Sequence, residues 1–154
     1  MLRVITNTAV IDALERFEVC LETPVIPGEM EHWAAALFDA YGELSPLLNN
    51  HLCTVHHSLL QQIAREDPGL LCHTKEMKLA DKETLETFER LRPWIEQLPE
   101  VATKIEPDEK RLETHVDSLI HDGLEFVMHV RKQETVLNTW HHEALCRDHH
   151  GDVD

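Results

Sequence analysis

The sequence predicts an all-α protein, an up-and-down antiparallel four-helix bundle with one short N-terminal helix and three long helices. Strong helix formers such as Leu, Ala, Glu, Lys and Gln dominate the 154 residues, which include only five glycines. Apolar residues recur every three to four positions through four segments, which is the period of an amphipathic helix. Short connections separate these segments, and helices joined by short connections lie antiparallel.

The first predicted helix is the short one and runs from about Asn7 to Glu22, with Thr6 or Asn7 as its cap. The prolines of the following TPVIPG stretch end this helix. Pro27 also suits the first turn of the next helix, because its missing N–H would have no partner there. The apolar face of the first helix consists of Val10, Leu14, Phe17 and Leu21.

The three long helices are predicted over residues 27–65, 68–98 and 107–147. Pro46 lies inside the first of them and should kink it or divide it in two. The REDPG stretch forms a tight corner before the second long helix. Residues 99–106 form the predicted loop before the third.

The chain is expected to be a single cytoplasmic domain, residues 1–154, with frayed ends at 1–6 and 148–154. It has no apolar run of membrane-spanning length and no signal-peptide pattern at its start. Its four cysteines form no C-x-x-C pair, which argues against a zinc knuckle and a thioredoxin-type motif. The sequence lacks a phosphate loop, a nucleophile elbow and a Cys–His nucleophile pair, so nothing in it indicates an enzyme.

The composition is strongly acidic, with a formal net charge of −15. This charge argues against nucleic acid and anionic membranes as partners, because both would repel such a surface. The chain also contains twelve histidines, and protonation of all of them would bring the charge to −3. An acid-sensing switch driven by these histidines is therefore one hypothesis.

Glu134 lies in the middle of the apolar stripe of the last helix. A buried, ionised carboxylate without a partner is very costly, so it must be neutral, paired or bound to a metal. Counting along antiparallel helices places Glu134 level with about His73, near His56, whereas His51 lies deeper. The expected cluster comprises His56, His73, Glu134, Asn138 and His141. Histidine and carboxylate ligands between bundle helices bind iron, zinc or manganese.

Glu134 also has an interpretation without a metal. It could pair with Arg131 or with a protonated His73 in a buried polar network. A second candidate, the H-x-x-x-E spacing of His121 and Glu125, would suit a metal. The helical period places these two residues on the solvent side, which favours a simple i,i+4 pair.

Two further polar residues, Asp81 and Thr84, fall on the inner face of the helix over residues 68–98. They are expected to meet Tyr41 or Ser118 in a polar network within the core.

The stretch HVRKQE, in which Glu134 follows His129 by five residues, resembles the hemerythrin-like, or HHE cation-binding, family. The resemblance covers about residues 28–146. It implies a four-helix bundle around a non-haem di-iron centre that carries or senses oxygen, or responds to nitric oxide or iron. It also implies that Glu134 is a carboxylate ligand and that His56 and His73 are histidine ligands. A relative with a single metal, or with none, remains open.

Two hypotheses for the function follow. In the first, the bundle binds iron, as a pair or singly, or another divalent metal, and binds or senses a diatomic ligand. Its predicted metal ligands are His56, His73, Glu134 and His141. In the second, the chain is a metal-free acidic interaction module that meets a basic protein partner or forms a homo-oligomer. Its expected exposed apolar patch consists of Leu60, Leu79, Trp94 and Val136.

Overall fold

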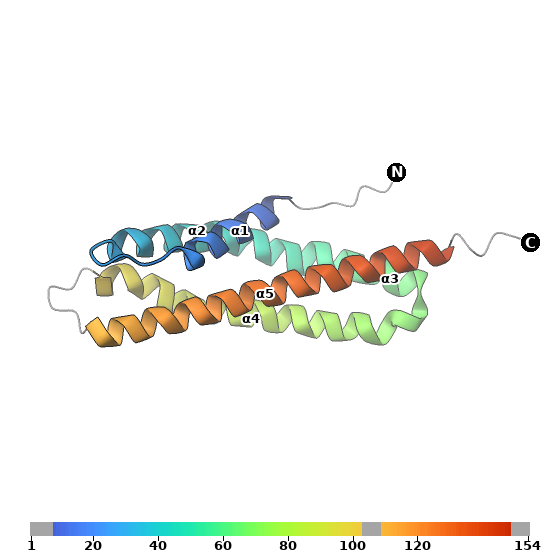
Figure 1. Cartoon of the computed structure of the whole chain (residues 1–154). Helices are drawn as coiled ribbons and strands as arrows, with labels where there is room; N and C mark the ends of the chain where they lie inside the picture. Colours follow the sequence, from blue (N-terminus) through green and yellow to red (C-terminus); the bar gives the residue numbers. More distant parts are fainter. Residues whose placement is uncertain (1–7, 103–108, 149–154) are drawn as a thin grey trace, which may run out of the picture.

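The computed structural model describes residues 8–102 and 109–148, and every regular element within these ranges is helical (Figure 1). The prediction of an all-α protein is therefore confirmed for this part of the chain. No helix in it combines the length and the apolar character needed to cross a membrane. The elements are α1 (Thr8–Glu22), α2 (Met30–Asn50), the π-helical η1 (His51–His56), α3 (His57–Glu66), the 3-10 helix η2 (Pro68–Leu70), α4 (Leu71–Ala102) and α5 (Glu109–Asp148).

The helices form an elongated molecule in which α4 and α5 lie side by side (Figure 1). At one end α1 packs against α2 and α5, and α2 packs against α4. At the other end α3 packs against both α4 and α5. The long helices α4 and α5 therefore connect two regions that are completed by different partners.

Each region has its own apolar core. The larger core gathers buried side chains of α1, α2, α4 and α5 around an aromatic group. In that group the rings of Tyr41 and Phe88 stack at 4.3 Å between centroids, and those of Phe88 and Phe126 stack at 5.0 Å. The smaller core lies at the α3 end and consists of Leu60, Ile63, Met77 and Leu137. Burial of these side chains is the main favourable contribution to the fold.

Two prolines lie inside helices. Pro46 is within α2, which continues to Asn50, so the helix is not divided at this proline. Pro99 is within α4, which continues to Ala102. The predicted start of the loop at residue 99 is therefore wrong, because residues 99–102 are helical. The neighbouring Leu98 is fully buried in the larger core, which holds the last turns of α4 in place despite the missing N–H.

Several predicted boundaries lie outside the described residues. They include the cap at Thr6 or Asn7, the helix start at Pro107, and the frayed ends over 1–6 and 148–154, except that Asp148 is the last residue of α5.

A turn of π-helix, η1, lies within a continuous helical run from Met30 to Glu66. The residues that flank it, Asn50 and His57, keep right-handed helical dihedral angles, so the chain does not break there. In an α-helix, residues five positions apart point about 140° away from each other. A π-turn closes hydrogen bonds between residues five apart and brings such residues onto one face. His51 and His56 are five apart, and η1 aligns them.

Gly123 and Gly42 provide a matched test of helix packing. A Cβ at Gly123 would lie 2.7 Å from Leu21 Cδ1, whereas a Cβ at Gly42 would have nothing within 4 Å. Gly42→Ala is expected to raise the free energy of unfolding by about 0.5–1 kcal/mol, because alanine is the better helix former. Gly123→Ala should instead lower it by about 1 kcal/mol, since overpacking outweighs that gain. Urea unfolding of both variants measures the two signs, and the same sign in both would contradict this packing of α1 on α5.

Candidate metal centre

Four polar side chains from three elements meet in the interior. His51 and His56 come from η1, Asp81 from α4 and Glu134 from α5. Glu134 Oε1 lies 2.6 Å from His51 Nε2 and 2.5 Å from His56 Nε2. On the other side of the His56 ring, Nδ1 lies 2.9 Å from Asp81 Oδ2. Both imidazoles therefore point their Nε2 atoms at one carboxylate oxygen.

The cluster lies between the two apolar cores. Along α5, Glu134 follows Val130 of the larger core and precedes Leu137 of the smaller one. His51, His56 and Asp81 are buried, whereas the Glu134 side chain is 26% exposed. The cluster is thus enclosed by helices on most sides and reaches solvent through the carboxylate on α5.

The electrostatics of the metal-free cluster favour a proton on His56. Burial alone would lower the pKa of His56, but hydrogen bonds to the carboxylates of Asp81 and Glu134 raise it to about 9. Burial alone would raise the pKa of Glu134, but hydrogen bonds from His51 and His56 lower it to about 2. His56 is therefore a doubly protonated imidazolium that donates to a carboxylate on each side.

These pKa values imply a pH dependence for the metal-free protein. The ion pair contributes fully to the free energy of unfolding between about pH 4.5 and 6.5. Its contribution is lost as pH rises towards about 9, where His56 loses its proton, and as pH falls towards about 2, where Glu134 gains one. Urea unfolding with a chelator present, compared between wild type and Glu134→Gln, isolates this pair. An identical alkaline decline in both proteins would contradict the assignment.

Two buried polar atoms of the cluster have no hydrogen-bond partner within the described part of the chain. They are His51 Nδ1 and Asp81 Oδ1. Such atoms are costly in a protein interior. Neither atom is among those that converge on the Glu134 carboxylate, so both remain available to a further hydrogen-bond partner.

The donor set fits a divalent metal ion. One ligand atom each from His51, His56 and Glu134 lies within 4.8 Å of the other two. Bonds from zinc to imidazole nitrogen and carboxylate oxygen are about 2.0–2.2 Å long, so one ion could reach all three atoms after small side-chain rotations. Such an ion would replace the protons on the two Nε2 atoms. The His56 Nδ1–H group would still donate its hydrogen bond to Asp81, and such a bond commonly orients a metal-binding histidine.

Two of the four predicted ligands, His56 and Glu134, come together in this cluster. His73 does not reach it: its exposed ring stacks on Trp140 at 5.6 Å between centroids. His141 is half-buried outside the cluster. The residue of α4 that reaches the cluster is Asp81, eight positions after His73. Eight residues correspond to about 12 Å of helix. The predicted position of α4 along α5 is therefore wrong by about this distance.

Asp81 and Arg131 have partners other than those expected. Asp81 contacts His56 rather than Tyr41 or Ser118, and the Tyr41 hydroxyl donates to a backbone carbonyl 2.7 Å away in α4. Arg131, an alternative partner for Glu134, instead donates to Glu18 of α1.

Sequence reasoning placed His51 too deep to join the cluster. With a uniform α-helical step, His51 and His56 fall on different faces, and only the π-turn of η1 aligns them. The spacing of five between two histidines was the available signal, but it indicates a shared face only if the local winding is already known.

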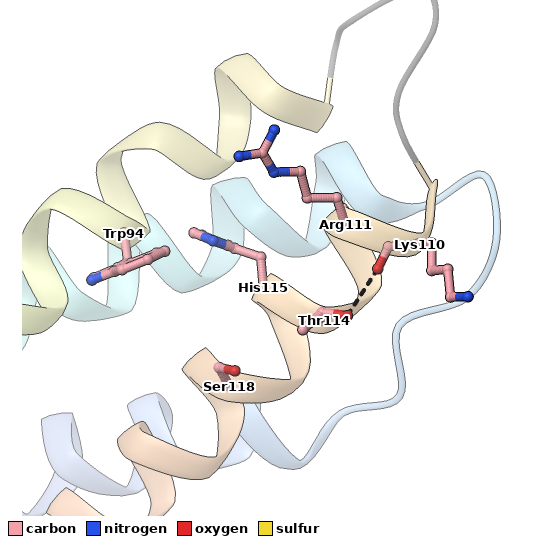
Figure 2. Close-up of a pocket in the computed structure, with 6 residues that line it drawn as sticks. All are labelled: Trp94, Lys110, Arg111, Thr114, His115 and Ser118. Atoms are coloured by element: carbon pink, nitrogen blue, oxygen red, sulfur yellow. Dashed lines mark hydrogen bonds between the residues drawn. The ribbon is translucent and has the colours of Figure 1, made fainter.

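One cavity of the molecule lies away from the buried cluster. A cavity of about 500 Å³ between α4 and the start of α5 is lined by Trp94, Lys110, Arg111, Thr114, His115 and Ser118 (Figure 2). In Figure 2 the rings of Trp94 and His115 lie next to each other; their centroids are 4.3 Å apart and their planes are tilted by 43°. None of these residues belongs to the buried cluster.

No family model, curated protein or solved structure matched the chain.

Proposed function

We propose that this chain is a hemerythrin-like metal-binding protein that binds one divalent transition-metal ion, foremost iron, through His51, His56 and Glu134. In this proposal the chain is an up-and-down antiparallel bundle of one short and three long helices, located in the cytoplasm. The observation that carries it is the convergence of two imidazole nitrogens and one carboxylate oxygen within 4.8 Å of one another. Imidazole nitrogen and carboxylate oxygen are donor types that divalent transition metals bind, and here three of them converge in a mostly buried group.

The ligand types favour a single ion. Two histidines and one carboxylate are the set used by non-haem iron(II) sites with open coordination positions. Three ligand atoms suit one ion, whereas a di-iron pair shares many more. Iron is the metal that the family resemblance implies, but we propose one ion in place of the di-iron pair.

The surroundings favour a small second ligand on the metal. The ion would supply an electrophilic, redox-active centre that binds oxygen or nitric oxide. The chain would hold the ion, with Asp81 orienting His56. Apolar core side chains on both sides restrict the space, and Glu134 is the member of the cluster that reaches solvent. We therefore favour a diatomic ligand over an organic substrate.

Binding of nitric oxide to the iron-loaded protein tests this proposal. Anaerobic protein loaded with ferrous iron is expected to give the electron paramagnetic resonance signal of a ferrous nitrosyl, in proportion to its iron content. His51→Ala should lose this signal because it removes one of the three ligands. His32→Ala, a change of an exposed histidine in α2, should keep it. Iron retained in the cluster without any nitrosyl signal would contradict a role in diatomic ligand binding.

Exposed apolar side chains support the second candidate, a metal-free acidic interaction module. Leu79 is 64% exposed, Trp94 51% and Met128 70%. Two members of the predicted patch do not belong to it, because Leu60 is buried in the smaller core and Val136 packs against that core. The remaining exposed residues are separate positions on α4 and α5, so this candidate has less support than the metal centre.

A further inference from the structure

α5 carries a second group of metal-ligand side chains on its outer surface. One ligand atom each from His121, Asp122 and Glu125 lies within 4.8 Å of the other two, and all three residues are exposed. Glu125 precedes Glu134 by nine residues, which is about 13 Å along the helix. This surface group is therefore separate from the buried cluster and does not depend on it.

The Glu125 carboxylate lies between two imidazoles. Its Oε2 is 3.9 Å from His121 Nε2, and its Oε1 is 3.9 Å from His129 Nε2. Residues four apart share one face of a helix, so this arrangement follows from the backbone alone. The helix holds the ligands together before any ion binds.

Packing of α5 on α1 fixes which face carries this group. Gly123 is buried, and a Cβ there would lie 2.7 Å from Leu21 Cδ1. His121 and Glu125 are two positions to either side of Gly123, so they point about 160° away from that contact. The ligands consequently face solvent and cannot be absorbed into the core.

The observed separations suit a small inward rotation onto a metal ion. Two ligands at tetrahedral angles on zinc, with bonds of about 2.0–2.1 Å, are about 3.4 Å apart. The 3.9 Å between His121 Nε2 and Glu125 Oε2 needs only a slight closing of exposed side chains. Ion pairs this long and this exposed contribute little free energy, so an ion displaces them at low cost.

We propose that His121, Asp122 and Glu125 form a second, exchangeable site for a zinc-class divalent ion. Imidazole nitrogen favours zinc and copper over magnesium or calcium, and two carboxylates offset the charge of the ion. A three-ligand set leaves a tetrahedral position open. Asp122 and Glu125 also line a cavity of about 460 Å³ between α5 and α4, which leaves room for an outside ligand on that position.

Isothermal titration of the untagged full chain with Zn²⁺ tests this second site. Two phases are expected, a tighter one from the buried cluster and a weaker one from the surface group. Glu125→Gln and His121→Ala should each weaken the second phase by about tenfold or more, because each removes a direct ligand. Both residues are exposed, so the variants should keep the circular dichroism spectrum of the wild type.

Two controls separate the surface site from the buried one. Glu134→Gln should remove the tighter phase and keep the weaker one, and His32→Ala should keep both. A weaker phase that survives unchanged in Glu125→Gln would overturn the surface site and leave the buried site unaffected. Loss of the weaker phase in Glu134→Gln would also overturn it, since the two groups would then not be independent.

Discussion

Glu134→Gln is expected to abolish tight binding of a divalent ion while leaving the helix content unchanged. Glutamine has nearly the same shape as glutamate, but it removes the negative charge and offers only a weakly coordinating amide oxygen. Glu134 is the only carboxylate with an oxygen within 2.6 Å of both His51 Nε2 and His56 Nε2 in the described part of the chain. Titration with Co²⁺, followed by its visible absorption bands, measures the loss directly.

Glu125→Gln is the matched control for this experiment. It makes the same chemical change on the same helix at an exposed position, and should leave the tight Co²⁺ signal intact. Tight binding that persists in Glu134→Gln, or that disappears equally in Glu125→Gln, would show that the ion is not held by the buried cluster.

Asp81→Leu is expected to lower the free energy of unfolding of the metal-free protein by about 3 kcal/mol. Asp81 Oδ2 accepts the Nδ1 proton of His56 at 2.9 Å, and both side chains are buried. Removing one partner leaves the imidazolium without its acceptor, which is the costly way to break a buried pair. The value lies at the low end of the usual range because leucine suits the apolar surroundings. Urea unfolding with a chelator present measures it.

Two further variants separate a lost hydrogen bond from a lost side chain. Asp81→Asn keeps an acceptor oxygen for the His56 Nδ1 proton and should recover part of the loss. Asp39→Leu, at an exposed position of α2, should stay within about 0.5 kcal/mol of the wild type. If Asp81→Leu proves as stable as Asp39→Leu, then His56 does not depend on Asp81.

The helical fold was predictable because its signals are local. The apolar period and the helix-forming composition need only neighbouring residues, and both are borne out by the described helices. The predicted end of α4 before Pro99 is wrong because the burial of Leu98, a tertiary contact, outweighs the local effect of a proline. The ends of helices depend on such contacts more than their middles do.

The site was predictable only in part because it depends on relations between helices. Glu134 stood out as a carboxylate on an apolar stripe, a signal confined to one helix. The partner from α4 depended on the axial offset of two helices, and an error of about 12 Å selected His73 in place of Asp81. The place of His51 in the cluster depends on a π-turn, which changes the direction in which side chains point. No distinctive residue type in the sequence indicates such a turn.

The most direct test of the central claim is the iron content of the untagged protein, measured by mass spectrometry. The protein would be loaded anaerobically with ferrous iron and washed with a weak chelator to clear the exposed group on α5. We expect about one iron per chain in the wild type and in Glu125→Gln, and almost none in His51→Ala. A wild-type protein without iron, or a His51→Ala variant that retains as much as the wild type, would contradict a metal centre at His51, His56 and Glu134.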